Sequence, residues 1–357
     1  MRKLILCFSC IFFLASCHTQ PLINNPKILP TNYVCAAKDC IETLKAPSFN
    51  KKLRRFYNIR GTIEFISIHN GIANLVFLVK NHGKIVCVLK CFLQKNVKEV
   101  VEISELTEKL RNKGFPVPKV DILLPTINYC DTLVSMAYCT GNIHSNLQKK
   151  ELERISKLMA NLHLFTNMPR DIPTKYLTNK KLEKLLNKCK KWKHIVEIQK
   201  IYEKIDLNYL DKLPLGLTHG DFSLTNILFD NKNEIVGILD FDRISKSYLL
   251  TDLARAQIFF GFDENGDLQE KNIHHFLRAY NLYRPLTKDE LINFYTHLKL
   301  MLIDVALSVY YYTYVKKDLD PNRFTQSKLN KGTNPEVLFH KLLQIKDKSF
   351  IDISKPQ

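Results

Sequence analysis

Residues 218–229 read Thr-His-Gly-Asp-Phe-Ser-Leu-Thr-Asn-Ile-Leu-Phe, and residues 230–242 continue Asp-Asn-Lys-Asn-Glu-Ile-Val-Gly-Ile-Leu-Asp-Phe-Asp. Two apolar runs flank the polar residues 231–234, a pattern that predicts a β-hairpin with a four-residue loop. If Asp230 faces Ile235, antiparallel pairing places Asn226 opposite Leu239. Asp240 is the next residue, so the turn returns a second oxygen ligand to the side of the first.

The polar residues of this segment suit the transfer of a phosphoryl group. An amide oxygen and a carboxylate on adjacent strand ends can hold Mg²⁺ together with the phosphates of ATP. Phosphoryl transfer needs little more than neutralised charge, an in-line hydroxyl and a base that orients it. Kinase catalytic loops separate the base from the metal-binding Asn by four residues. We therefore predict Asp221 as the base and Asn226 and Asp240 as the magnesium ligands, whereas His219 either braces the loop or takes part in the chemistry.

The rest of the chain predicts two lobes. Its 357 residues, 45% hydrophobic and 25% charged, can bury two cores. Strands are expected over 62–68, 74–80 and 85–91, a helix over 97–112, and mostly helices after residue 139. The predicted fold class is α+β, bilobal, with a β-rich N-terminal nucleotide-binding lobe at 46–138 and a helical C-terminal catalytic lobe at 139–345. A tail follows at 346–357.

The first lobe supplies candidates for binding ATP. A turn at 81–84 pairs Lys80 with Ile85 and sets Lys90 opposite Leu75, next to the turn that contains Gly71. Gly71 allows the backbone to approach a phosphate closely, and Lys90 can then pair with the α and β phosphates.

A glutamate of the 97–112 helix is expected to orient Lys90. Glu102 and Glu105 both qualify, and the sequence does not choose between them. The passage through Met136 and Tyr138 is expected to form the hinge where backbone groups meet adenine.

The chain carries 53 Lys and Arg against 35 Asp and Glu, a net charge of +18. The lysines are scattered along solvated helix faces and include no RNA-binding motif, which disfavours nucleic acid as a partner. The apolar, tyrosine-rich segment 298–315 is expected to be a core helix rather than a membrane span. The five cysteines beyond residue 40 have no metal-ligand spacing and are expected to be reduced thiols.

The amino terminus has features of an exported protein. Arg2 and Lys3 precede an apolar run, and Leu14-Ala15-Ser16-Cys17 resembles the lipobox of bacterial lipoproteins. Segment 1–17 is thus signal-like, Cys17 is a possible lipidation site, and the proline-containing 18–45 is a linker. A lipidated Cys17 is the only expected membrane attachment. The need for ATP favours the cytoplasm, and the alternative is an exported lipoprotein that uses the fold as a binding module.

The motif His-Gly-Asp-x₄-Asn followed by Ile-Leu-Asp-Phe resembles the aminoglycoside phosphotransferase and choline kinase superfamily. The resemblance implies ATP and Mg²⁺ as cofactors, a small-molecule hydroxyl as acceptor, and Asp221, Asn226, Asp240 and Lys90 in the roles given above. It also implies that Asp252, in Thr-Asp-Leu-Ala, braces the catalytic loop, and that Leu162-His163 is the family's Leu-His at a helix end.

Within the superfamily, the chain is most similar to the homoserine kinases of this fold, on Gly71-Ile-Ala-Asn, on Gly114-Phe-Pro-Val-Pro and on the residues from Tyr280 to Leu291. The expected reaction is therefore the O-phosphorylation of homoserine, with aminoglycosides, choline and ethanolamine as alternative acceptors. Where that family carries Arg-Phe-x-x-Ser-Arg in its last core helix, this chain reads Asp304-Val-Ala-Leu-Ser-Val. Two arginines are replaced and an acid is gained, which weighs against a carboxylate-bearing acceptor.

Overall fold

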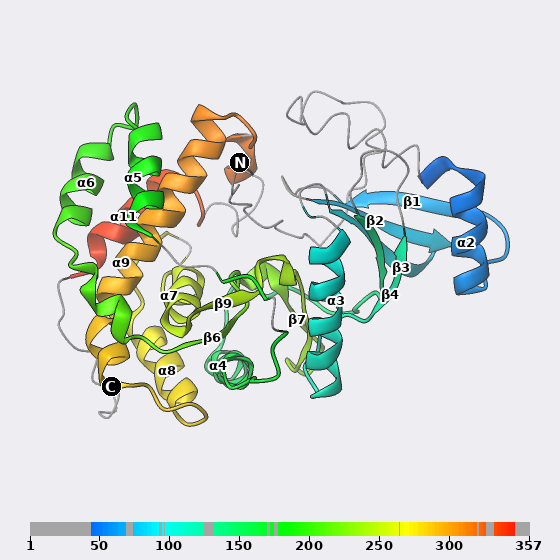
Figure 1. Ribbon diagram of the computed structural model, residues 1–357, viewed down its shortest axis with the longest axis horizontal. Coiled ribbons are helices and arrows are strands. Elements are labelled where there is room, and N and C mark those ends of the chain that lie inside the picture. Colours follow the sequence, from blue (N-terminus) through cyan, green and yellow to red (C-terminus); the bar gives the residue numbers. More distant parts are fainter. Residues whose placement is uncertain are drawn as a thin grey trace. The chain divides into compact units, whose positions relative to one another are not determined.

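The computed structural model describes residues 44–68, 74–92, 95, 97–124, 132–169, 172–174, 178–263, 265–319, 321–325 and 332–346. The predictions for Cys17, for Gly71, for nearly all of the linker and for the tail beyond residue 346 lie outside these residues. The chain divides into two compact units (Figure 1). The first extends to Ile143 and includes Leu228–Asp230 and Val236–Asp240, and the second contains the remainder. The division falls a few residues after the predicted boundary at 138, and most of the hairpin groups with the first unit.

The first unit is built on a five-stranded antiparallel sheet with the strand order β1-β2-β3-β5-β4. The helix α2 precedes the sheet and α3 follows its third strand. The predicted strands and the predicted helix over 97–112 are all present. The bounds are α2 Pro47–Tyr57, β1 Ile63–Ile68, β2 Asn74–Asn81, β3 Lys84–Phe92, α3 Val97–Asn112, β4 Val120–Leu124 and β5 Thr132–Met136.

The two faces of this sheet bury different helices, because successive side chains of a strand point to opposite faces. Leu89 packs with Leu53 of α2 in one apolar cluster. Phe92 packs with Val100 of α3 in another. Lys90 has the same parity as Phe92, and its Nζ lies 5.0 Å from the centre of the Phe92 ring. The strand alternation therefore directs Lys90 toward the α3 face of the sheet.

The pairing of β2 with β3 corrects one prediction. Lys80 does pair with Ile85, as expected, but the register shifts at a bulge between Val79 and Lys80. Lys90 consequently lies opposite Val76 rather than Leu75. A bulge adds one residue to one strand only, and neither the turn sequence nor the alternation of apolar residues reveals it.

The second unit is mainly helical. Its helices are α4 Lys149–His163, α5 Asn179–Lys188, α6 Ile195–Glu203, α7 Leu249–Phe260, α8 Glu270–Asn281, α9 Lys288–Tyr310 and α11 Pro335–Gln344. A short ribbon of β6 Leu215–Thr218 and β9 Ser245–Tyr248 was not predicted. The predicted hairpin is present as β7 Ile227–Phe229 paired with β8 Ile235–Ile238.

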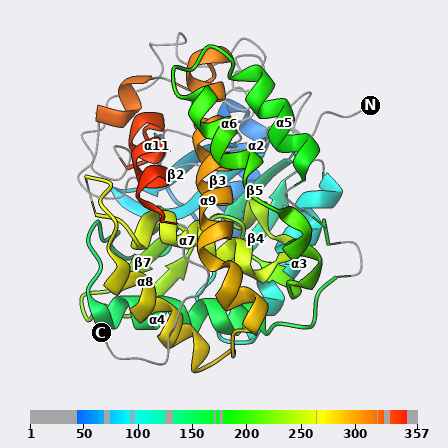
Figure 2. The same ribbon diagram turned by 90° about the vertical axis from the view of Figure 1, so that its left-hand side faces the viewer.

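The helix α9 forms the centre of the second unit and contacts α5, α6, α7 and α11 (Figure 2). It begins with a capping box in which Thr287 and Glu290 satisfy each other's backbone N–H groups. Together with the π-helical turn that follows, it is long and apolar enough to cross a membrane, but 78% of its most apolar window is buried inside the protein. This burial is that of a core helix, as the sequence predicts.

The cysteines differ in part from the prediction. Cys87, Cys139 and Cys189 are free thiols, whereas Cys91 is disulfide-bonded. The prediction of a reduced thiol is therefore wrong at Cys91. A disulfide requires two sulfur atoms to meet in space, and the sequence spacing of cysteines does not report that distance.

Candidate active site

The loop between β6 and β7 carries Asp221 and Asn226 and turns sharply at Gly220. Gly220 has a φ of +77°, and a Cβ atom there would lie 2.8 Å from the carbonyl oxygen of Arg243. The residue must therefore be glycine, both for its left-handed backbone and for this close approach. Directly after the turn, the backbone N–H of Asp221 donates to His219 Nδ1 at 3.2 Å.

His219 lies inside the unit and braces the loop. It is fully buried, and the rings of Phe222 and Phe241 pack edge-on against it, with centroids 5.4 and 4.6 Å away. Because Nδ1 accepts the N–H of Asp221, the imidazole acts here as a hydrogen-bond acceptor that fixes the backbone of the predicted base. This geometry favours the bracing role over the chemical one.

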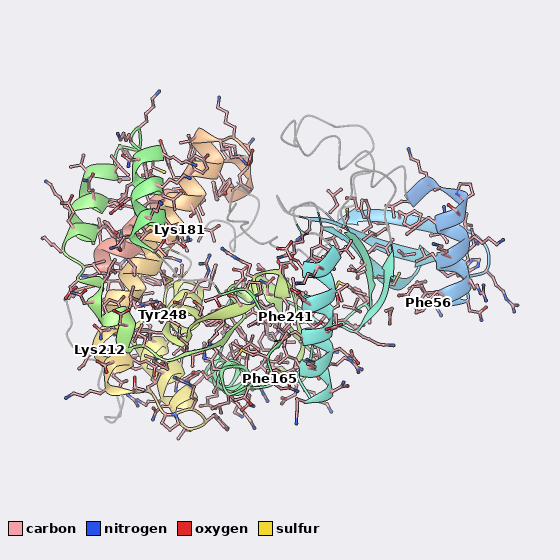
Figure 3. All side chains as sticks on the ribbon, viewed as in Figure 1. Phe56, Phe165, Lys181, Lys212, Phe241 and Tyr248 are labelled. Atoms are coloured by element: carbon pink, nitrogen blue, oxygen red, sulfur yellow. The ribbon has the colours of Figure 1, made fainter. Side chains whose placement is uncertain are left out.

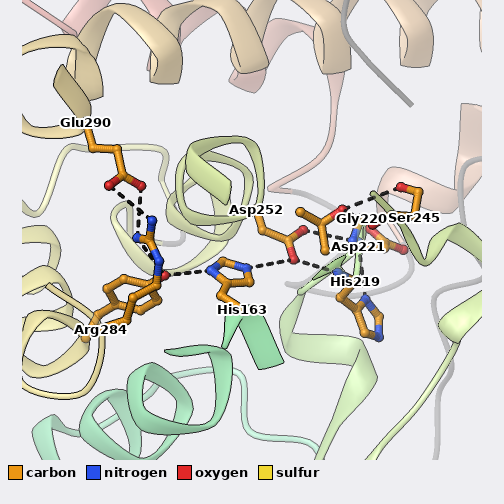
Figure 4. Close-up of polar contacts among 10 residues, drawn as sticks. His163, His219, Gly220, Asp221, Ser245, Asp252, Arg284 and Glu290 are labelled. Carbon is orange, nitrogen blue, oxygen red and sulfur yellow. Dashed lines mark hydrogen bonds and ion pairs between the residues drawn. The ribbon is translucent and has the colours of Figure 1, made fainter. Parts of the chain in front are cut away.

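Asp252 anchors the same loop from the first turn of α7 (Figure 4). One carboxylate oxygen accepts the backbone N–H of His219 at 2.6 Å, and the other accepts that of Gly220 at 2.8 Å. His163 Nε2 lies 3.3 Å from the first of these oxygens. Burial alone raises the pKa of Asp252, but the hydrogen bond and charge of His163, with the backbone N–H of Gly220, outweigh it and hold that pKa below its ordinary value.

The anchor continues as a chain of buried polar groups from α4 to the start of α9. The other nitrogen of His163 lies 2.7 Å from the hydroxyl of Tyr280. Arg284 donates to that hydroxyl at 3.1 Å and to the carboxylate of Glu290 at 2.9 Å. Figure 4 shows these contacts in one line. The similarity to homoserine kinases includes residues 280–291, and the structure gives those residues a shared role in positioning the catalytic loop.

Asn226 is oriented by the predicted base. Its amide N–H₂ donates to the carbonyl oxygen of Asp221 at 2.9 Å and lies 3.3 Å from Asp221 Oδ2. Its Oδ1 atom is buried and accepts no hydrogen bond from the residues that the structure describes. A buried amide oxygen without a donor is costly unless a ligand completes it. The amide is therefore turned so that its oxygen is available to a cation, which fits the predicted magnesium ligand.

Asp240 and Lys90 meet within the first unit. Lys90 Nζ lies 2.9 Å from Asp240 Oδ1, and both side chains are almost completely buried. Asp240 has a φ of +64°, a left-handed conformation that is uncommon for residues other than glycine and is concentrated at functional sites. The sequence predicted both residues but not this contact between them.

The remaining predicted residues of the first unit have the following positions. Glu102 lies 3.5 Å from Lys98, one turn earlier on α3, and Glu105 is exposed. Met136 ends β5 and packs beside Val134, and the next residue, Ala137, donates its N–H to Lys119. Tyr138 follows in an extended stretch after the strand. The roles of these four residues in binding ATP stay predictions.

Two cationic residues of the second unit that share Asp304 were missed. Arg255 lies one turn after Asp252 on α7, and Asp221 is among the charges that act on its guanidinium. Lys181 of α5 forms an ion pair with Asp304 of α9. Arg255 follows Asp-Leu-Ala directly and could have been suspected from the sequence, but no local signal singled out Lys181 among so many lysines.

In the part of the chain that the structure describes, no group of three or more His, Cys, Asp or Glu side chains could hold a metal ion. Mg²⁺ needs no such cage, because it is usually bound through one or two protein oxygens, with phosphates and water completing the shell. The amide oxygen of Asn226, unpaired among the described residues, is a donor of the kind that this ion accepts.

Several solved kinases and phosphotransferases are similar in fold to this chain. A choline/ethanolamine kinase family protein from Mesorhizobium loti has a TM-score of 0.58, at 14% identity over 88% of this chain and 95% of that one. A microcompartment-associated aminopropanol kinase has a TM-score of 0.57, at 14% identity over 83% and 95%. A spectinomycin phosphotransferase in complex with ADP and spectinomycin has a TM-score of 0.56, at 17% identity over 82% and 96%.

Sequence comparison agrees with the structural likeness. A homoserine kinase from Methylobacillus flagellatus is 23% identical over 253 residues, which are 66% of this chain and 75% of that protein. The model of the phosphotransferase enzyme family matches residues 64–286, well over half of the chain. That match includes the sheet, the hairpin and the loop with Asp221 and Asn226. The chain belongs to the phosphotransferase enzyme family and is a kinase.

Proposed function

We propose that the enzyme transfers the γ-phosphate of ATP to the hydroxyl group of homoserine. The observation that carries the chemistry is the arrangement of the catalytic loop. Asp221 is held by His219 through its backbone and by Asn226 through its carboxylate, while Asp252 fixes the two preceding N–H groups. Because the base is already held in place, little additional entropy is lost when it orients a hydroxyl for transfer.

The residues divide the work as follows. Asp221 accepts a hydrogen bond from the acceptor hydroxyl, aligns it with the γ-phosphate and takes its proton. Lys90 pairs with the phosphates of ATP, and Asp240 holds its buried ammonium group in place at 2.9 Å. Asn226 and Asp240 would hold Mg²⁺, which when bound neutralises the phosphate oxygens. Gly71, Glu102 or Glu105, Met136 and Tyr138 complete the proposed ATP site.

Homoserine is the leading acceptor because of the homoserine kinase similarity and the matching motifs. Aminoglycosides and the amino alcohols choline and ethanolamine are the alternatives, since the structural neighbours include kinases for such compounds. A polycationic aminoglycoside would need an acidic pocket, and the lysine-rich second unit is unfavourable for it.

A phosphorylation screen tests the proposal. Purified enzyme with Mg-ATP is offered homoserine, choline, ethanolamine and kanamycin, and ADP release and phosphorylated product are measured. We expect homoserine to be phosphorylated. Asp221→Asn should abolish transfer but retain Mg-ATP binding, because the base is not a nucleotide anchor. Asp240→Ala should weaken Mg-ATP binding itself. Normal turnover by Asp221→Asn contradicts the assignment of the base.

The proposed location is the cytoplasm, where ATP is available. The signal-like segment and Cys17 lie outside the described residues, and the alternative of an exported, lipidated binding module rests on them alone. Fractionation of cells that express the native chain or Cys17→Ala separates the two possibilities. Recovery of the native chain with the outer face of the membrane, and of the variant in the soluble fraction, would favour the lipoprotein.

A further inference from the structure

A group of charged side chains from three helices meets beside the catalytic loop of the second unit. Lys181, labelled on α5 in Figure 3, belongs to the first turn of that helix. Its Nζ lies 2.8 Å from Asp304 Oδ1. Arg255 Nη1, from α7, lies 3.8 Å from the other oxygen of Asp304. Asp304 is 2% exposed and Arg255 is 7% exposed. We call Lys181, Arg255 and Asp304 the charged triad.

The triad lies within electrostatic reach of the predicted base. Burial and the charge of Arg243 lower the pKa of Arg255, and Asp221, Asp304 and Asp252 partly oppose them, so that it ends at about 10. Burial likewise lowers the pKa of Lys181, and Asp304 opposes that effect. Lys181 and Arg255 therefore share the carboxylate of Asp304, and Asp221, the residue proposed to take the proton of the acceptor, is among the charges that act on Arg255.

The α9 side of the triad is incompletely satisfied. Asp304 and Ser308 are four residues apart and so lie on the same face of the helix. The hydroxyl of Ser308 is buried and makes no hydrogen bond to any described residue. Asp304 Oδ1, by contrast, is held by Lys181 at 2.8 Å, so Ser308 is the unsatisfied group on this face among the described residues. Buried groups of this kind normally have partners, so a polar ligand is expected here.

The triad also resolves the loss of cations noted in the sequence. Where the resemblance leads us to expect two arginines, this chain reads Asp304-Val-Ala-Leu-Ser-Val. The structure supplies two cations to the same helix face from α5 and α7 instead. A site with two cations and one carboxylate matches a zwitterion. It suits neither a polycation nor a quaternary ammonium without an anionic group.

Resting on the proposed function, we propose that the charged triad is the acceptor-recognition site, and that it binds a hydroxy amino acid. Arg255 and Lys181 bind the acceptor's carboxylate and Asp304 binds its ammonium group, while the hydroxyl of the same molecule reaches Asp221. Arg255 suits this role because its guanidinium presents paired donors to a carboxylate. Ser308 is placed to complete the polar contacts of the bound acceptor.

Three small alcohols that differ in their charged groups test the proposal. Homoserine carries both charged groups, 3-aminopropan-1-ol lacks only the carboxylate, and 4-hydroxybutanoate lacks only the ammonium group. Each is titrated calorimetrically into the full-length enzyme loaded with Mg-ADP, which reports binding without turnover. We expect homoserine to bind at least about 30-fold more tightly than 3-aminopropan-1-ol, since leaving a buried cation without its anion is expensive. Homoserine should also bind more tightly than 4-hydroxybutanoate.

Variants assign the preference to residues. Arg255→Gln and Lys181→Met should each weaken the binding of homoserine and 4-hydroxybutanoate by at least about 10-fold and leave that of 3-aminopropan-1-ol within about 2-fold. Asp304→Asn should weaken the binding of the two amines and spare 4-hydroxybutanoate. Lys180→Met is the matched control, because Lys180 is the exposed neighbour of Lys181, and should change nothing. Unchanged Mg-ADP affinity shows that a variant is folded.

The outcomes separate this inference from the proposed function. Equal binding of homoserine and 3-aminopropan-1-ol overturns the inference, whatever the enzyme phosphorylates. An equal loss of affinity for all three alcohols in Arg255→Gln also overturns the inference, because that is the result expected if Arg255 has only a structural role. Binding that depends on the carboxylate and is abolished in the variants supports the inference. If homoserine binds in this way but is not phosphorylated, only the proposed reaction is refuted.

Discussion

Replacing Asp252 by Asn tests whether the buried polar chain positions the catalytic loop. The carboxylate offers two accepting oxygens, one to the N–H of His219 and one to that of Gly220. Asn at the same place offers one accepting oxygen and an amide N–H₂ that cannot accept. One backbone N–H therefore loses its partner inside the protein, and the other loses a charge-assisted bond.

The loss of stability expected for Asp252→Asn follows from these contacts. A hydrogen bond to a charged group contributes roughly 1.5–3 kcal/mol, and an orphaned buried donor costs about 1–3 kcal/mol. We expect Asp252→Asn to reduce the free energy of unfolding of the second unit by about 3 kcal/mol. In a unit of this size that corresponds to a fall of roughly 6–12 °C in Tm. Because the loop carries Asp221, kcat should fall on the order of 100-fold, equally for every acceptor.

Thermal unfolding and steady-state kinetics measure both effects, and Asp211→Asn is the control because Asp211 is exposed. The structure also fixes the direction of a pH effect. With its pKa held below the ordinary value in the folded state, Asp252 contributes stability that is complete above about pH 4 and is lost as the pH falls through the lower, folded pKa. The variant should lack this loss. If Asp252→Asn unfolds within about 1 °C of wild type and keeps its kcat, the anchoring role is wrong.

Three further predictions concern single residues of the second unit. Gly220→Ala should abolish activity and lower Tm, because its Cβ would meet Arg243 at a positive φ; unchanged kinetics would contradict this. Burial lowers the pKa of His297 to about 3, so between pH 6.5 and 5 only the unfolded state takes up a proton at this residue. The free energy of unfolding of the wild type, measured by urea denaturation, should therefore fall by about 2 kcal/mol over this range. His297→Gln should not show this fall. Burial lowers the pKa of Lys341 to about 8, so stability should rise by about 3 kcal/mol from pH 8 to 10.5, a rise that Lys341→Met should abolish.

The sequence predicted the parts of the site that depend on local spacing. The hairpin, the four-residue interval between Asp221 and Asn226, and the position of Lys90 on a strand all follow from turn chemistry and alternation. The exact register of Lys90 did not, because a bulge between Val79 and Lys80 moved it by one residue. Local patterns fix which residues lie on a strand and which face they share, but an inserted residue changes the cross-strand partner without changing the composition.

Contacts between distant segments could not be predicted in the same way. The ion pair of Lys90 with Asp240 joins residues 150 positions apart, and the sequence reasoning proposed a glutamate of the neighbouring helix instead. His163 was identified only through a family resemblance, and nothing in its surroundings predicted that it would meet both Asp252 and Tyr280. Such partners are set by how helices pack, which depends on many weak apolar contacts rather than on one motif.

Five buried charged residues of the second unit belong to the catalytic-loop anchor or to the charged triad, and this distribution bears on why they are there. Asp252, Arg255, Arg284, Glu290 and Asp304 are all at most 8% exposed. Buried ion pairs are often no more stabilising than apolar residues of the same shape, because desolvation offsets their attraction. Stability alone would therefore not favour five such residues in one region. What they do supply is direction: each polar bond holds a donor or a charge at one angle, and phosphoryl transfer depends on angles at Asp221. We therefore expect apolar replacements in this region that restore stability to leave activity low.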